Sequence, residues 1–368
     1  MTSGYEFRLA GFEENEALCE FFRESSIPGN ISLAFARDPS FFTASQAGSI
    51  SHQTVIYQHK ETKKIAGVGC RNIRKLYVGG VSSSVGYMSN LRNLPETRNG
   101  FALAKGLKFC RELHRDGAVP YYLASILDDN SYARCILESG RAGMPKFTYI
   151  GDFNTYLISI RKIAKNAKSD SVEKCSKDYI SGAYDCLDAW NYEHQFAPAY
   201  LENDISGNTG LLPCFSSDDL YVYRDGNEIL GTLGVWDQRT FKQTIVTDYS
   251  QKMKFVKPIY DAVAKIAGYP GLPGIGEEFR CVYASFISSK GNNKKVFRSL
   301  IQKACEDKKL ASVDFLIVGL SREHELEDVA RHLASRILPS RIYIVHWEED
   351  NISIPIMDRP IHLEVATL

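Results

Sequence analysis

The feature that most constrains the fold is an order of expected elements that occurs twice in the 368-residue chain. Hydrophobic periodicity predicts a helix, a hairpin and then alternating strands and helices in residues 5–160, and the same order returns in residues 183–366. The expected elements include strands over Ile65–Val78, Phe147–Ile150 and Asn154–Ile160, and a helix over His324–Leu338. Antiparallel strands followed by a strand–helix–strand crossover are typical of an α/β (α+β) domain. The repeated order therefore predicts a structural duplication of two domains, each a mixed, mostly antiparallel sheet flanked by helices.

Length and composition give the expected domain boundaries. Residues 1–165 form the N-terminal domain, residues 166–180 a polar linker, and residues 181–368 the C-terminal domain. A solvated first helix of the second domain explains the polar segment equally well. In the second half, Asp225-Gly226 between two alternating segments is a strong signal for a hairpin.

Charge is balanced over the whole chain, with 44 Lys and Arg against 44 Asp and Glu. This balance argues against a protein that coats nucleic acid. The two halves differ, because residues 1–165 carry 21 basic and 15 acidic residues, which is +6, and the remainder carries 23 and 29, which is −6. We therefore expect an anionic ligand in the first half.

Nine cysteines, an odd number, are scattered without a C-x-x-C pair. This distribution favours reduced thiols over a zinc site or a disulfide framework, so we expect no metal. The first residues lack the basic and apolar stretches of a secretory signal, and no apolar run reaches the roughly 18 residues that span a bilayer. We therefore expect a cytoplasmic protein with no membrane partner and no nucleic-acid partner.

The strongest candidate for a binding site is the segment Tyr87–Leu107. A strand is predicted to end near Asn93, and a helix is predicted over Arg98–His114. The first N–H groups of a helix have no partner within the helix, and Gly100 lets a ligand approach the backbone closely. Together with the charge of Arg98, this pattern predicts a cradle for an anion such as pyrophosphate. An ordinary strand–turn–helix explains the same pattern.

The same segment resembles the cofactor motif of a known superfamily. Residues Leu91–Gly100 are similar to L-x-V-x-P-x-x-R-G-x-G-I-G, the acetyl-CoA-binding motif of the Gcn5-related N-acetyltransferases (GNAT). Asn130, Ala133 and Glu138 match a second motif of that superfamily, N-x-x-A-x-x-x-x-E. The resemblance covers residues 5–160 directly and the second half only through the order of its elements. It implies a tandem protein with two GNAT-like domains.

The resemblance implies acetyl-CoA as the donor substrate and a small-molecule or peptide amine as the acceptor. It places these residues at the cofactor: Leu91, Arg92, Asn93, Arg98, Asn99, Gly100, Phe101, Ala102, Leu103 and Asn130. In the family, the strand residues pair with pantetheine amides, the start of the helix holds the pyrophosphate, and the asparagine binds the pantetheine arm. The second half lacks the glycine pattern, which implies a degenerate copy that shapes the acceptor cleft.

The chain departs from the family motif at positions that matter for chemistry. Asn99 and Phe101 replace glycines, and Asn93 stands where valine is common. Leu137 occupies the position where many members carry the tyrosine that protonates the leaving thiolate.

Two residues near the second motif are candidates for acid and base. Tyr132 is the nearest substitute for the missing acid, and Asp128, which follows a predicted strand, is a candidate base. Packing for Tyr132 and helix capping for Asp128 are the alternative roles.

These observations predict an N-acyltransferase that moves an acetyl group from acetyl-CoA to an amine. A non-catalytic acyl-CoA-binding or partner-binding protein is the alternative. A transferase that uses aminoacyl-tRNA is a third possibility, against which the balanced charge argues. Polar residues after the strand that ends at Trp236, including Gln238 and Lys242, are a candidate lining for an acceptor pocket, with a solvated strand edge as the alternative.

Overall fold

A computed structural model describes residues 4–97, 100–140, 144–164, 171–207, 209–267, 269–350, 352 and 357–368. The strands of the first half are β1 (Tyr5–Leu9), β2 (Ile31–Ala36), β3 (Ser51–His59), β4 (Ile65–Val78), β5 (Val81–Asn93), β6 (Tyr122–Leu127) and β7 (Lys146–Ser159). Its helices are α1 (Asn15–Glu24), α2 (Phe41–Gln46), α3 (Gly100–His114), α4 (Ser131–Leu137) and α5 (Ile160–Ala164).

The second half repeats much of this order. Its strands are β8 (Val172–Lys174), β9 (Leu220–Asp225), β10 (Glu228–Trp236), β11 (Gln243–Tyr249), β12 (Cys281–Ser289), β13 (Phe315–Ser321) and β14 (Ala334–His346). Its helices are α6 (Ile180–Tyr192), α7 (Glu202–Ile205), α8 (Gln251–Ala267), α9 (Lys294–Glu306) and α10 (Glu327–Leu333). The hairpin predicted at Asp225-Gly226 is the turn between β9 and β10, where Gly226 has φ 58°.

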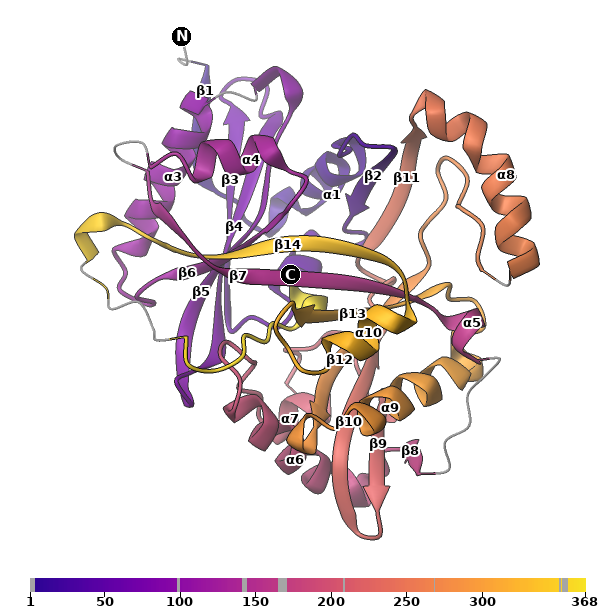
Figure 1. The fold of residues 1–368 in the computed structure, drawn as a ribbon. Coiled ribbons are helices and arrows are strands. Elements are labelled where there is room, and N and C mark those ends of the chain that lie inside the picture. The colour runs from indigo at the N-terminus through magenta and orange to yellow at the C-terminus, as the bar shows by residue number, and fades with distance from the viewer. Residues whose placement is uncertain are drawn as a thin grey trace.

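Twelve strands form one sheet in the order β1-β3-β4-β5-β6-β14-β7-β13-β12-β10-β9-β8, and β2 pairs with β11 separately. This order reads the same from both ends, because β1, β3, β4, β5 and β6 correspond to β8, β9, β10, β12 and β13. The last strands are exchanged: β14 pairs with β6 and β7, and β7 also pairs with β13. In Figure 1, β7 and β14 cross the middle of the molecule between the two halves. The predicted duplication of an α/β fold is confirmed.

The exchange of β7 and β14 between the two sheet halves affects how the chain can be divided into domains. The proposed boundaries at residues 165 and 181 follow the order of elements along the chain, and residues 165–170 lie outside the described part. In the sheet, the last strand of each half lies against the other half. Each half thus completes its sheet with a strand from its counterpart.

The helix predicted over His324–Leu338 is shorter than expected. Helix α10 ends at Leu333, and residues 334–338 already belong to β14. Residues 334–338 pair with β7, and these ladder hydrogen bonds satisfy their backbone and outweigh the local helical pattern. For the same reason, two strands predicted over Phe147–Ile150 and Asn154–Ile160 are one continuous strand, β7.

Helix α9 shows how the apolar pattern builds the core. Asn293 caps it, because its Oδ1 accepts hydrogen bonds from the N–H groups of Lys295 and Val296. The buried residues of the helix are Val296, Phe297, Leu300, Ile301, Ala304 and Cys305. This spacing places one face against the sheet, and each large side chain there contributes about 1.5–3 kcal/mol of burial free energy.

The nine cysteines are all unpaired thiols, of which Cys135 and Cys214 are exposed. The described residues contain no group of three or more His, Cys, Asp or Glu side chains that is suited to a metal ion. Within the same ranges, no helix has the length and apolar content to cross a bilayer.

Candidate functional site

Strands β5 and β6 pair over a short stretch, at the middle of β5 and the beginning of β6. Their parallel pairing joins Gly86 to Tyr122 and Tyr87 to Leu123, and the two strands then diverge. From residue 88 to Asn93, β5 pairs with β4 alone. The backbone at this edge of β5 is therefore available to an extended ligand.

A β-bulge lies in the diverging part of β5. The register between β4 and β5 shifts between Val68 and Cys70, and Asn90 has φ 54°. Asparagine tolerates this left-handed conformation better than most residues. The Asn90 amide donates to Ser45 Oγ at 3.2 Å, which fixes its orientation. Bulges end pairing and redirect side chains beside functional sites, and this one opens β5 just before the predicted cofactor residues.

A small, mainly apolar cavity adjoins the end of β5. It lies between α3 and strands β1, β3, β4 and β5. Four of the predicted cofactor residues, Leu91, Asn93, Ala102 and Leu103, line it together. Gly67 also lines this cavity. A Cβ atom at Gly67 would lie 2.0 Å from Asn93 Oδ1, so only glycine at this position leaves space for the Asn93 side chain as it is placed.

Arg92 points away from this cavity. Its Nη1 donates to the backbone oxygen of Ser25 at 2.8 Å, and its guanidinium lies 5.1 Å from the centre of the Phe22 ring. These contacts tie β5 to α1. The side chain of Arg92 therefore stabilises the wall behind the predicted cofactor strand.

Asn130 begins helix α4. Its Oδ1 accepts a hydrogen bond from the Ala133 N–H at 3.2 Å, so the side chain acts as the N-cap of this helix. Helix α3 begins at Gly100, within two residues of the predicted start. The predicted anion-binding residues Arg98 and Asn99 lie outside the described residues, as does the side chain of Phe101.

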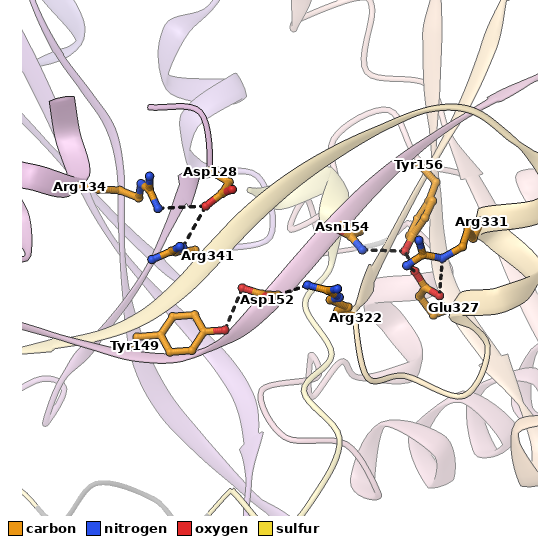
Figure 2. A network of polar contacts seen from close by, with 10 residues as sticks. All are labelled: Asp128, Arg134, Tyr149, Asp152, Asn154, Tyr156, Arg322, Glu327, Arg331 and Arg341. Carbon is orange, nitrogen blue, oxygen red and sulfur yellow. Dashed lines mark hydrogen bonds and ion pairs between the residues drawn. The ribbon is translucent and has the colours of Figure 1, made fainter. Parts of the chain in front are cut away.

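The proposed base, Asp128, is held by two arginines. Its Oδ1 accepts hydrogen bonds from Arg134 Nη1 and Arg341 Nε, both at 3.0 Å (Figure 2). Arg341 belongs to the exchanged strand β14, so the two halves of the chain build this cluster together. Tyr132, the proposed acid, is 52% exposed on α4, and Leu137 is buried. Neither Asp128 nor Tyr132 is among the described residues that line the apolar cavity.

A second polar cluster in Figure 2 joins β7 to α10. The carboxylate of Glu327 accepts hydrogen bonds from the Tyr156 hydroxyl and from Arg331. Burial raises the pKa of Glu327, but the bonds from Arg331 and Tyr156 outweigh burial and bring the pKa below its usual value. Asn154 donates to the Tyr156 oxygen at 3.0 Å and completes the set. The cluster is a structural clamp between the two halves.

In the second half, strands β12 and β13 show the same short parallel pairing followed by a β-bulge. The last residue pair of these parallel strands joins Tyr283 to Ile317. Three residues later, Phe286 has φ 55° at a register shift against β10. The spacing equals that between Tyr87 and Asn90 in β5, so the bulge and the divergence are duplicated features.

Residues 361–368 of the chain itself fill the second opening. A short 3-10 helix at Val365–Thr367 packs against β12 and β13. The carboxylate of Glu364 accepts a hydrogen bond from the Phe286 N–H at 3.1 Å, directly at the bulge. A Cβ atom at Gly319 of β13 would lie 2.5 Å from Val365 Cβ, so the fit is close. The second half therefore offers a ligand less room at this position.

Two basic side chains hold this C-terminal segment. Arg74 donates to the Thr367 carbonyl, and Lys242 Nζ donates to the Ala366 carbonyl at 3.0 Å. N–H donors at the last carbonyls of a helical turn satisfy otherwise unpaired acceptors. Burial lowers the pKa of Lys242 well below its usual range and raises the pKa of Glu364 to about 7.

Gln238 and Lys242, which were predicted as a candidate lining for an acceptor pocket, contact the C-terminal segment. Gln238, like Lys242, donates to the Ala366 carbonyl, at 3.0 Å. Both residues lie at the junction of the two halves, and both position the C-terminal segment.

Comparison with solved structures places this geometry among known folds. N-myristoyltransferase from Saccharomyces cerevisiae with bound myristoyl-CoA matches with a TM-score of 0.63 and 12% identity, over 97% of this chain and 85% of that one. A structure of the same enzyme with myristoyl-CoA and inhibitors matches with a TM-score of 0.61 and 12% identity, over 99% and 87%. This chain has the fold of N-myristoyltransferase. Because that enzyme is built of tandem GNAT-like halves, the fold implied by the sequence resemblance is confirmed.

No protein-family model and no curated protein sequence matches the chain. The likeness to N-myristoyltransferase concerns the fold, and the chemistry has to be argued from the residues described above.

Proposed function

We propose that this chain is an N-acyltransferase that binds a CoA thioester in its first half and transfers the acyl group to an amine. The observation that carries the proposal is the divergence of β5 from β6 at the Asn90 bulge, next to the start of α3 at Gly100. The open edge of β5 offers backbone groups to the amides of pantetheine. The first turn of α3 offers N–H groups and a positive dipole to the diphosphate.

The proposal also has to specify which acyl group the donor carries. Acetyl-CoA is the donor that the GNAT-like motif at Leu91–Gly100 implies. A longer acyl chain is the second candidate, because the cavity beside Leu91 and Ala102 is mainly apolar. The fold that the chain shares with an enzyme solved with bound myristoyl-CoA supports the same candidate. A series of acyl-CoA donors of increasing chain length, compared by kcat/KM, separates the two.

In the proposed reaction, a neutral amine attacks the thioester carbonyl, an oxyanion forms, and the C–S bond breaks to release CoA thiolate. We assign the removal of the amine proton to Asp128 and protonation of the thiolate to Tyr132. Both arginine bonds go to Asp128 Oδ1, so we assign the amine proton to Oδ2, which accepts no hydrogen bond from the described residues. Most of the rate enhancement is assigned to positioning of donor and acceptor.

A non-catalytic acyl-CoA-binding protein is the competing function. The buried Leu137 at the usual acid position and the two ion pairs of Asp128 support it. Under this alternative, the donor binds without turnover.

The test combines binding and turnover. Calorimetry with acetyl-CoA measures affinity in the native chain, in Gly100→Val at the start of α3, and in Lys295→Gln in the first turn of α9 in the second half. We expect the valine to abolish binding and the glutamine to leave it unchanged, with native unfolding curves for both. Release of CoA thiol with small-molecule and peptide amines then separates transferase from binder. Equal affinity in the native chain and Gly100→Val would mean that the cradle lies elsewhere.

A further inference from the structure

Helix α8 presents its large apolar side chains to solvent. Phe255 is 79% exposed, Ile259 68%, Val263 59% and Ile266 89%. Their spacing of four, four and three residues places them on one side of the helix. Val256 and Tyr260 are exposed as well and widen this apolar face to an arc of about 140° at 3.6 residues per turn. Contiguous apolar surface of this kind marks an interaction site.

The opposite side of α8 faces the protein with Met253 and the buried Ala264 beside the polar pair Lys257 and Asp261. Lys257 Nζ donates to Asp261 Oδ2 at 2.7 Å, and Asp261 Oδ1 accepts from the Leu272 N–H at 2.8 Å. The Lys257 ammonium also lies 5.8 Å from the centre of the Tyr249 ring. A surface helix ordinarily turns its apolar side inward, so the amphipathicity of α8 is reversed. The orientation is held by these polar contacts, which leaves the apolar face for a partner.

The charge of α8 selects the kind of partner. Its seventeen residues include Lys252, Lys254, Lys257 and Lys265 against the single acid Asp261, a net charge of +3. Lys254 pairs with Asp248 at 2.9 Å, whereas Lys252 and Lys265 make no ion pair within the described residues. Both unpaired lysines are exposed, and at 100° per residue Lys252 lies within the apolar arc, whereas Lys265 lies about 80° beyond its edge, on the side of Asp261. A helix that combines a broad apolar face with free lysines fits an anionic lipid surface.

The position of α8 agrees with such a surface. Figure 1 shows the helix at the edge of the molecule beside β11, away from the twelve-stranded sheet. A convex, isolated helix can sink its apolar side into the boundary between headgroups and acyl chains without a matching groove. Packing against α8 of a second copy would instead bring two clusters of like charge together.

We propose that α8 is an interfacial helix that binds the chain to anionic membranes, with its axis in the membrane plane. The apolar face enters the acyl region, and Lys252 extends its ammonium group to the acidic headgroups. The sequence-based prediction of no membrane partner rested on the lack of a spanning segment, which a helix lying in the interface does not need. The proposal does not depend on the acyltransferase function.

Co-sedimentation of the full chain with vesicles tests the proposal. We expect binding to phosphatidylcholine vesicles that contain phosphatidylserine, and at least tenfold weaker binding after the double substitution Ile259→Glu and Ile266→Glu. Lys252→Gln should weaken binding to the anionic vesicles by about fivefold, and Lys265→Gln, on the side of the helix away from the membrane, should weaken it less. Leu201→Glu, at a site that is 64% exposed outside α8, is the matched control and should bind like the native chain.

A fluorescent reporter shows whether α8 itself enters the lipid. The three tryptophans of the chain, Trp190, Trp236 and Trp347, are buried, so a Phe255→Trp variant adds one exposed indole. Its emission should shift to the blue with anionic vesicles and stay unchanged with phosphatidylcholine alone. Lack of binding to either vesicle would overturn the proposal. So would a dimer in sedimentation that the two Glu substitutions dissociate while vesicles leave the indole emission unchanged.

Discussion

Asn90 in β5 and Phe286 in β12 occupy equivalent positions in the two halves. Each lies three residues after the last parallel residue pair of its strand and three residues before the strand ends, with φ 54° and 55°. The two halves differ in what lies beside the strand after this bulge. In the second half Glu364 binds the bulge itself, whereas in the first half an apolar cavity lies beside the end of β5, on the side of β4 and α3. This asymmetry is the reason to place the donor in the first half.

Gly67→Ala should destabilise the cofactor strand. The new Cβ would meet Asn93 Oδ1 at 2.0 Å and the Arg92 carbonyl at 3.2 Å, so the Asn93 side chain has to move. We expect the free energy of unfolding in urea to fall by about 1–3 kcal/mol. Gly69→Ala is the matched control, because its Cβ would meet Leu91 at an ordinary 3.8 Å.

Adding Asn93→Ala to Gly67→Ala should return part of the lost stability, since it removes the closer of the two contacts. A double-mutant cycle measures this coupling. Strictly additive effects of the two substitutions would contradict the proposed clash.

The buried histidines should make the fold sensitive to acid. His194 Nδ1 donates to the Trp190 carbonyl at 2.6 Å, and His324 Nδ1 accepts from the Leu326 N–H at 3.0 Å. These bonds leave His324 Nε2 to donate to His194 Nε2 at 3.1 Å, which requires both rings to be neutral. Burial lowers the pKa of His194 to about 4 and of His324 to about 3. The unfolded chain therefore takes up protons first as the pH falls.

The resulting loss of stability begins near pH 6.5, the usual histidine value, and continues toward the native pKa values. We expect a slope that approaches about 1.4 kcal/mol per pH unit for each histidine. Urea unfolding across this range measures it. His194→Gln should flatten the profile, and the exposed His332→Gln should leave it unchanged. A native profile that is flat between pH 6 and 4 would refute the assignment of neutral rings.

Glu364 should change the pH dependence of stability in the opposite direction, because its native pKa is raised. Burial raises its pKa to about 7, so the native state binds a proton that the unfolded chain has already released near the ordinary value of 4.5. Its contribution to stability is complete below about pH 4.5 and is lost as the pH rises through 7. Glu364→Gln keeps a neutral side chain at every pH and should remove this loss. Urea unfolding at pH 5 and pH 8 compares the two chains, and an equal change in both would count against a buried protonated carboxyl.

The proposed base is tested by Asp128→Asn. Because Asp128 and its partners Arg134 and Arg341 are partly exposed, the change should cost less than about 1 kcal/mol of stability. Loss of a general base should lower kcat by about 10²–10⁴. Asp129→Asn, on the exposed neighbouring residue, is the control. Thiol release at the native rate from Asp128→Asn would remove Asp128 from the mechanism.

Several elements were predictable because the local pattern and the tertiary environment agree. The strand predicted over Ile65–Val78 has those same bounds in the structure, and the Asp225-Gly226 hairpin forms as expected. The pairing of β2 with β11 was not predicted, because the two segments lie about half the chain apart. Periodicity describes one segment at a time and does not report which remote segment completes its hydrogen bonds.

Part of the candidate site was also predictable from the sequence. The motif identified Leu91, Asn93, Ala102 and Leu103, which line one cavity. It did not show the bulge, although the pattern Tyr-x-Ser occurs in both strands, at Tyr87 and again at Tyr283. The arginine from β14 that binds Asp128 was also missed, since the strand exchange that brings it there depends on the whole sheet.

The most direct test of the account is the structure of the chain in complex with acetyl-CoA. We expect the pantetheine to lie along β5 beyond Tyr87, with the diphosphate at the first turn of α3. A thioester bound instead beside Lys290–Lys295 in the second half, or the absence of any bound nucleotide at saturating concentration, would contradict the assignment of donor binding to the first half.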